Sequence, residues 1–173
     1  MDQHRSVLAS HELEPVYNEK SKILILGSFP SVKSRESNFY YGHPRNRFWD
    51  VLSYVYLGQN NASFQSVADK KQFLYDHEIA LWDVIDSCRI TGSSDSSIKE
   101  VIPVDIIRIL HACKISAIVT NGQTANRLYK QHLLATAAMD AILLPSTSPA
   151  NAAFSLERLQ EVWAEAIHTV IAK

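Results

Sequence analysis

The sequence predicts an α/β fold of three layers, in which a central four-stranded parallel sheet lies between helices. Two observations carry this prediction. Short apolar runs of strand length alternate with longer segments whose apolar residues recur at helical spacing. Strands that alternate with helices form βαβ units, because each crossover helix returns the chain to the same end of the sheet. The length suits one domain, expected over residues 1–173, with residues 1–20 as an N-terminal arm or short helix.

The individual elements follow from the apolar pattern in chain order. Strands are expected over residues 21–26, 79–84, 116–120 and 141–144. Helices are expected over residues 48–56, 65–77, 103–112, 122–132 and 155–172. The first helix rests on a stripe that includes Phe48, Val51 and Val55, and the third on Pro103, which suits a first helical turn. Residues rich in Gly, Ser and Pro predict loops over 27–47 and 87–97.

The composition is typical of a soluble globular protein, with 46% hydrophobic and 20% charged residues. No apolar run approaches the roughly 20 residues that span a bilayer. The first five residues are polar and no apolar signal segment follows them. We therefore expect a cytoplasmic protein with no membrane partner. A net charge of −1 weighs against a protein that coats DNA without specificity.

The cysteines and other metal-ligating residues predict no metal and no cofactor. Cys88 and Cys113 are the two cysteines, and they form neither a CxxC pair nor a metal-ligand spacing. We expect both to be buried or half-buried free thiols. No cluster of His, Cys, Asp and Glu has the spacing of a metal site, and no GxSxG motif indicates a nucleophilic serine.

Polar motifs cluster where a ligand would bind in such a fold, beyond the carboxyl ends of the strands. One loop contains Gly27, Ser28, Phe29, Pro30 and Ser31. The other contains Ser146, Thr147, Ser148 and Asn151, between and after two prolines. Backbone N–H groups and hydroxyls in these loops suit a phosphate or a base, although each loop alone also reads as an ordinary turn.

The segment that follows the first loop combines the side chains of nucleic-acid recognition. Aromatic rings stack on bases, amides read base edges and cations bind phosphates. Each residue also has a plainer structural reading. Tyr40 and Tyr41 are either core aromatics or rings that stack on a base. His43 either assists a leaving group or forms a hydrogen bond with the backbone. In the structural interpretation, Asn46 caps a helix. The cations are Lys33, Arg35, Arg45 and Arg47. Asp83, at the end of the second strand, is either a turn cap or a reader of ring N–H groups.

At these residues the chain resembles the hypoxanthine-DNA (deoxyinosine) glycosylase branch of the uracil-DNA glycosylase superfamily. The resemblance rests on Tyr-Tyr-Gly-His-Pro-Arg-Asn-Arg-Phe-Trp at 40–49 and Leu-Pro-Ser-Thr-Ser-Pro-Ala-Asn at 144–151, and it runs from residue 24 to residue 152. It implies a four-stranded parallel sheet between helices. It also implies a monofunctional, monomeric enzyme of base excision repair that hydrolyses the N-glycosidic bond of a deaminated base in DNA, with hypoxanthine as the expected base.

The resemblance implies roles for individual residues. The loop from Gly27 to Ser31 corresponds to the first active-site motif and residues 145–151 to the second. Tyr41 corresponds to the ring on which the flipped base stacks, and Asp83 to the reader of the base edge, with Gly27, Ser28 and Phe29 beside them. Ser146 corresponds to the contact with the leaving base or sugar. The expected DNA contacts are Pro30, Ser31, Lys33, Arg45, Arg47, Thr147, Ser148 and Asn151.

One position departs from the family pattern. Many members carry an Asp or Asn in the first motif that orients the attacking water, and this chain has Phe29 there. Either another amide takes over this role, or catalysis depends more on stabilising the leaving group. Asn38 is the first candidate for the water-positioning group, with Asn46 second and His43 as a further catalytic candidate.

Three other functions stay open from the sequence alone. The first is a glycosylase of the same superfamily that prefers uracil or a mismatched pyrimidine. The second is a DNA-binding module that has the crevice but lacks the chemistry, as Phe29 would permit. The third, a nucleotide-binding enzyme unrelated to DNA, is disfavoured because no phosphate-loop motif is present.

Overall fold

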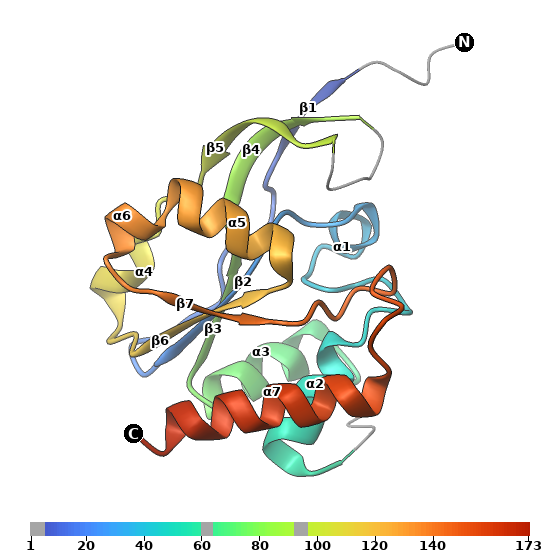
Figure 1. The fold of residues 1–173 in the computed structure, drawn as a ribbon, viewed down its shortest axis with the longest axis vertical. Helices are drawn as coiled ribbons and strands as arrows, with labels where there is room; N and C mark the ends of the chain where they lie inside the picture. Colours follow the sequence, from blue (N-terminus) through green and yellow to red (C-terminus); the bar gives the residue numbers. More distant parts are fainter. Residues whose placement is uncertain (1–5, 60–63, 92–96) are drawn as a thin grey trace.

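The predicted four-stranded parallel sheet is confirmed. The computed structural model describes residues 6–59, 64–91 and 97–173 (Figure 1). The strands of this sheet are β2 (Ile23–Gly27), β3 (Ile79–Asp83), β6 (Ala117–Asn121) and β7 (Ala141–Leu144). They are ordered β3-β2-β6-β7, and every neighbouring pair is parallel. All residues of β2, β3 and β6 are buried, as expected for strands covered on both faces.

Helices cover both faces of this sheet, as the three-layer prediction requires. Figure 1 shows α2, α3 and α7 on one side of the sheet and α4, α5 and α6 on the other. The bounds on the first side are Phe48–Leu57, Val67–Asp76 and Leu156–Ile171. The bounds on the second side are Ile107–Ala112, Gln123–His132 and Leu134–Ala137. Within the described residues, no helix is both long and apolar enough to span a membrane.

The contact between α2 and α7 forms the part of the core that lies nearest the carboxyl ends of the strands. The predicted stripe on α2 is buried, and Phe48 packs edge-to-face against Trp163 of α7 with ring centroids 6.1 Å apart. The indole Nε1 of Trp163 donates a hydrogen bond to the Pro145 carbonyl at 3.0 Å. The buried Trp163 side chain of α7 therefore fixes the start of the second loop predicted to carry function.

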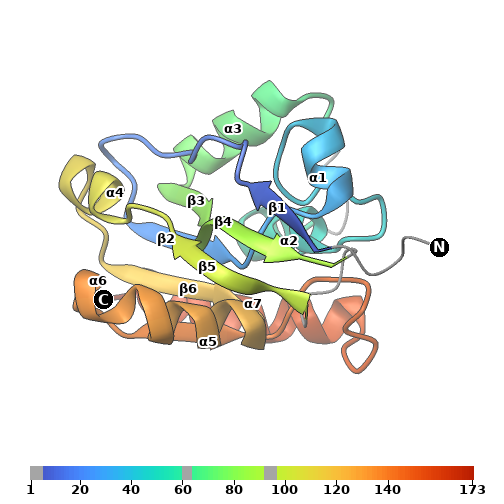
Figure 2. The same ribbon diagram turned by 90° about the horizontal axis from the view of Figure 1, so that it is seen from above.

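A second sheet, which the sequence pattern does not predict, lies beside the first. It is antiparallel, in the order β1-β4-β5, with bounds Val7–Ser10, Ile85–Ile90 and Lys99–Pro103 (Figure 2). Val7–Ser10 therefore form a strand where an arm or short helix is expected. The prediction of a loop over 87–97 is wrong at residues 87–90; residues 92–96 lie outside the described residues.

The physical reason for these errors is visible in the pairing. The register between β4 and β5 shifts twice, so the alternation of apolar and polar residues that marks a strand is broken. Pro103 ends β5 and does not begin a helix; α4 begins at Ile107. A proline at the end of an edge strand costs no ladder hydrogen bond, which is why the sequence alone does not distinguish the two positions.

A short helix, α1 (Val32–Ser37), also lies within the segment predicted as a loop. The Ser31 hydroxyl caps it by accepting a hydrogen bond from the Ser34 N–H at 3.1 Å. Asn38 ends it in the left-handed region at φ 55°. Six residues are too few to show a helical period in the sequence.

Candidate active site

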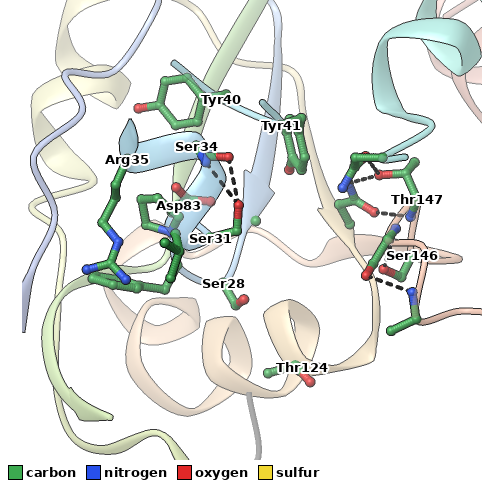
Figure 3. Close-up of a pocket in the computed structure, with 18 of the residues that line it drawn as sticks. Ser28, Ser31, Ser34, Arg35, Tyr40, Tyr41, Asp83, Thr124, Ser146 and Thr147 are labelled. Atoms are coloured by element: carbon green, nitrogen blue, oxygen red, sulfur yellow. Dashed lines mark hydrogen bonds between the residues drawn. The ribbon is translucent and has the colours of Figure 1, made fainter. Parts of the chain in front are cut away.

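A cavity of about 580 Å³ opens at the carboxyl ends of the parallel strands, at the place predicted from the fold (Figure 3). The residues from the predicted site that line it are Gly27, Ser28, Phe29, Pro30, Ser31, Tyr41, Asn46, Asp83, Ser146, Thr147 and Ser148. Further lining residues are Val32, Ser34, Arg35, Tyr40, Ile90, Asn121, Thr124 and Ala150. The cavity volume falls in the range of roughly 300–1,000 Å³ found for small-ligand sites.

Gly27 allows two functional side chains to approach the floor of the cavity. A Cβ on this residue would lie 2.3 Å from Oδ1 of Asp83 and 2.9 Å from the hydroxyl of Tyr41. Either distance is shorter than a Cβ tolerates, so only glycine permits this arrangement. The absence of a side chain at Gly27 therefore lets the Asp83 carboxylate and the Tyr41 hydroxyl lie close to the backbone, beside the same part of the cavity.

Asp83 forms a buried pair with His11. Oδ2 of Asp83 lies 2.8 Å from Nε2 of His11, and the side chains are 5% and 2% exposed. Oδ1 has no hydrogen-bond partner among the described residues, so it is the oxygen left for a ligand. Sequence reasoning missed His11, because a single histidine 72 positions away in a polar segment carries no pattern that links it to Asp83.

The N-terminal segment that carries His11 is held to the domain at several points. β1 pairs with β4, and the His11 N–H donates to the Asp86 carbonyl at 2.6 Å. Val16 forms an isolated bridge with Leu81 of β3. The Tyr40 hydroxyl donates to the Glu14 carbonyl at 2.8 Å. Tyr40 is 2% exposed. Of its two predicted roles, core aromatic and stacking ring, the structure therefore supports the core aromatic.

Tyr41 has one ring face covered and its hydroxyl beside Asp83. Its ring stacks on Phe48, with centroids 3.9 Å apart and planes 20° apart. The backbone lies in the left-handed region at φ 53°, uncommon for a residue with a large side chain. The hydroxyl has no hydrogen-bond partner among the described residues. Burial, and next the Asp83 carboxylate, raise the pKa of this phenol far above its usual value, while the Asn121 amide opposes the rise.

A hydrogen-bonded chain joins the ends of β6 and β7 to the loop before α2. The Thr147 N–H donates to Oδ1 of Asn121, so the amide nitrogen of Asn121 donates to the Thr147 hydroxyl, both at 3.0 Å. The Thr147 hydroxyl must then donate to Oδ1 of Asn46, 2.9 Å away. Because this oxygen also accepts from the Phe48 N–H at 3.0 Å, the orientation of the Asn46 amide is determined. Its Nδ2 group has no partner among the described residues and is available as a donor.

Ser146 offers a second donor at the rim. Its Oγ accepts a hydrogen bond from the Ser148 N–H at 3.1 Å, and its own proton has no acceptor within the described parts of the chain. A Cβ on Gly122 would lie 2.9 Å from the Ser146 Cβ, and Gly122 has φ 97°. This glycine therefore permits both the turn after β6 and the position of Ser146.

Arg47 is half-buried and holds the second loop. Its guanidinium donates to the carbonyls of Thr147, Ser148, Asn151 and Phe154. These contacts do not support the prediction that Arg47 binds DNA phosphates, because four of its hydrogen bonds are made within the protein. Asn151 is likewise structural: its amide donates to the Ser146 carbonyl at 2.9 Å, and it does not line the cavity.

Other predicted site residues also lie away from the cavity lining. Asn38 is exposed and ends α1, so the structure does not bring the first candidate for water positioning to the site. His43 accepts a hydrogen bond from the Arg45 N–H at 3.1 Å and stabilises a turn. Lys33 pairs with Glu36 on the surface of α1, at 3.0 Å. Arg45 is exposed and has no ion-pair partner within the described parts of the chain.

Arg35 is the cation that the cavity lining itself contains. Its guanidinium carbon lies 5.7 Å from the centroid of the Phe29 ring, within the range of a cation–π contact. Its Nε is buried and has no hydrogen-bond partner among the described residues. The Phe29 ring also contacts the His11 ring in a T-shaped arrangement, with centroids 6.0 Å apart and planes 84° apart. Among the described residues, no group of three or more His, Cys, Asp or Glu is arranged to hold a metal ion.

The fold and the cavity define an α/β protein with a polar, ligand-sized site at the ends of its parallel strands. The family model of the uracil DNA glycosylase superfamily matches residues 14–167. The chain therefore belongs to the uracil DNA glycosylase superfamily.

Two named relatives and one solved structure are similar over most of this chain. The hypoxanthine DNA glycosylase of Methanosarcina barkeri is 34% identical over 154 residues, which cover 88% of this chain and 94% of that protein. The hypoxanthine DNA glycosylase of Methanosarcina acetivorans is 34% identical over 159 residues, covering 84% and 90%. A solution NMR structure from Methanosarcina acetivorans, provisionally named as a uracil DNA glycosylase, has a TM-score of 0.76 and 31% identity, with 95% of this chain and 99% of that chain covered.

Proposed function

We propose that this protein is a monofunctional DNA glycosylase of base excision repair that removes hypoxanthine from DNA. The observation that carries the proposal is the unpaired Oδ1 of Asp83 on the floor of the cavity, with His11 occupying the other oxygen; no partner of Oδ1 occurs among the described residues. Deamination converts N1 of adenine from an acceptor into an N1–H donor. A hydrogen-bond acceptor fixed inside a base-sized cavity is complementary to that donor.

The substrate must reach this cavity outside the helical stack. A base within a duplex exposes neither its Watson–Crick edge nor its C1′ atom, so the nucleotide is extruded into the pocket. The free face of the Tyr41 ring, opposite Phe48, offers a stacking surface for the base. Action as a monomer stays a prediction. The cytoplasmic location stays a prediction.

The side chains present favour stabilisation of the leaving base as the main catalytic effect. Water attacks C1′ while the bond to the base nitrogen breaks, and the electron pair of that bond leaves with the base. The Nδ2 group of Asn46 and the hydroxyl of Ser146 are donors that can stabilise this developing negative charge. Oδ1 of Asn46 already accepts two hydrogen bonds, so orienting the attacking water is the less suited role for this residue.

DNA contacts are proposed for the rim of the cavity and the adjoining surface. Ser31 and Ser148 line the rim, and Pro30 shapes it beside them. Lys33 and Arg45 provide positive charge on exposed surface near the two loops. Such contacts place the duplex over the cavity without reading its sequence.

Single-turnover base release from matched duplexes tests the proposal. Duplexes that contain hypoxanthine, uracil or xanthine at one position are incubated with excess protein, and the freed base is measured. We expect hypoxanthine to be released fastest, with the strand intact until alkali cleaves the abasic site. Faster release of uracil would favour the pyrimidine-specific alternative. Tight binding to an abasic-site duplex without release of any base would indicate a silent binding module.

A further inference from the structure

The buried His11–Asp83 pair does more than neutralise a carboxylate. A hydrogen bond of 2.8 Å between Nε2 of His11 and Oδ2 of Asp83 requires one proton between the two atoms. If Asp83 is ionised, the proton is on Nε2. If Asp83 is neutral, the proton is on Oδ2 and is donated to Nε2. In both states Oδ1 carries no proton and accepts hydrogen bonds.

The polarity of Oδ1 determines which purine edge the cavity accepts. Hypoxanthine presents N1–H and is bound by an acceptor. Adenine presents an unprotonated N1, whose lone pair is repelled by an acceptor and would be bound only by a donor. A carboxyl group free to turn its own O–H toward the cavity would reverse this preference. A site whose polar group forms a hydrogen bond with one purine edge disfavours a purine with the opposite edge, because the buried polar group of the site is then left without a partner.

We propose that His11 is a positioning residue that keeps Oδ1 of Asp83 a hydrogen-bond acceptor, and that it thereby excludes adenine, the undamaged counterpart of hypoxanthine. This inference rests on the proposed function. It assigns base discrimination to a residue of the N-terminal segment that touches neither the base nor the sugar.

The surroundings of Asp83 explain why the histidine is needed. Asp83 is 4% exposed, and a buried carboxyl group without a hydrogen-bond partner favours its neutral form. Tyr40 and Tyr41 face it with hydroxyl groups; the carboxylate contributes to the raised pKa of each, and both stay neutral. Arg35 contributes a positive charge to the same cavity from α1, where it stacks on Phe29. Without His11, Asp83 has no hydrogen-bond partner among the described residues, and its proton could occupy either oxygen.

The test compares His11→Leu, which removes the donor, with His11→Gln, whose Nε2 supplies a neutral donor at a similar reach. The control is His111→Leu, an exposed residue of α4. Each folded protein is assayed by single-turnover release from duplexes that contain hypoxanthine, adenine or unsubstituted purine. The assays cover the pH range from 5.5 to 8.5, chosen to span roughly the ordinary pKa of histidine.

We expect release of purine relative to hypoxanthine to rise about ten- to a hundredfold in His11→Leu at the acidic end of this range, and to stay at the wild-type ratio in His11→Gln. In the wild-type protein the same ratio should stay constant across the range. This last measurement needs no variant, so it decides the matter even if His11→Leu fails to fold.

The outcomes separate this inference from the proposed function. If the wild-type protein releases no hypoxanthine, the proposed function is overturned and this inference with it. If it releases hypoxanthine and the profiles of His11→Leu and wild type coincide, only the role of His11 is overturned. A purine-to-hypoxanthine ratio that rises in the wild-type protein as the pH falls would also overturn it, because Oδ1 would then be acting as a donor.

Discussion

The Thr147 hydroxyl donates a hydrogen bond to Oδ1 of Asn46 at 2.9 Å, across 101 positions of the chain. This bond ties the loop before α2 to the loop after β7, and Asn121 continues it to the end of β6. The amide nitrogen of Asn46 is thereby turned away from Thr147, and the orientation of the proposed donor depends on a residue that is itself fully buried.

Replacing Asn46 by Asp should abolish most base release. Asp keeps an oxygen that can cap α2 and accept from Thr147, but it loses both N–H donors and adds a negative charge beside the leaving base. We expect single-turnover release to fall by roughly 100-fold or more, while binding to an abasic-site duplex is retained. The comparison is Asn38→Gly, in which glycine suits the left-handed backbone at φ 55° and excision should stay unchanged. Equal losses in the two variants would contradict the catalytic role of Asn46 and the surface position of Asn38.

Gly27→Ala should disrupt the site and lower stability together. The new Cβ would lie 2.3 Å from Oδ1 of Asp83 and 2.9 Å from the Tyr41 hydroxyl, so one of these side chains must move. We expect a loss of about 1–3 kcal/mol in the free energy of unfolding, measured in urea, and a large loss of base release. In Gly58→Ala the new methyl group meets no atom within 4 Å, but the residue has φ 66°. That variant should cost about 1 kcal/mol and leave base release intact.

Arg45 and Arg47 should behave differently when the salt concentration is varied. Arg45→Ala should reduce the slope of log binding constant against log salt by about one, because a phosphate contact is lost. Arg47→Met should leave the slope unchanged and lower base release, because methionine cannot donate to the carbonyls that hold residues 147–154. Fluorescence anisotropy on an abasic-site duplex at several salt concentrations measures both slopes. A smaller slope in Arg47→Met would show that Arg47 makes the phosphate contact expected from the sequence.

The buried phenols should make the protein less stable at high pH. Burial raises the pKa of Tyr40 and Tyr41 in the folded state above the ordinary value of 10.0. Their stabilising contribution is complete below that ordinary value, since both states are then neutral. It is lost as the pH rises above it, because only the unfolded chain ionises. Urea unfolding at pH 8 and about pH 10.5 should show this fall.

Tyr41→Phe should flatten that alkaline fall. The Tyr41 hydroxyl has no partner among the described residues, so its removal should cost little stability at pH 8. Tyr40→Phe should cost more at pH 8, because its hydroxyl bonds to the Glu14 carbonyl. If Tyr41→Phe showed the same alkaline fall as the wild-type protein, the phenol of Tyr41 would have to ionise normally in the folded state.

The parallel sheet could be predicted because its strands appear in the sequence as short apolar runs, and three of them, β2, β3 and β6, are buried on both faces. β7, for example, has the predicted bounds, and the polar residues at the strand ends meet at one cavity as the topology requires. The antiparallel sheet could not be predicted in the same way, since the bulged register between β4 and β5 removes the period of two from the sequence.

Side-chain roles within the site were harder to predict than its location. Arg47 and Arg45 have the same side-chain type and nearly the same position in the chain, and only the fold shows that one is enclosed by carbonyls. Asn38 and Asn46 are both amides of one loop, but the short helix α1 and its cap turn Asn38 to the surface. The contact between His11 and Asp83 depends on strand pairing of the N-terminal segment, and no local pattern encodes it.

The pairing of β1 with β4 has a practical bearing on how proteins of this type are compared and shortened. The superfamily model first matches at residue 14, just after the imidazole that contacts Asp83. A fragment trimmed to that boundary would retain the whole parallel sheet and Asp83 but discard the histidine that pairs with it. The first residue of the family match is therefore not a suitable starting point for a shortened protein that is meant to be active.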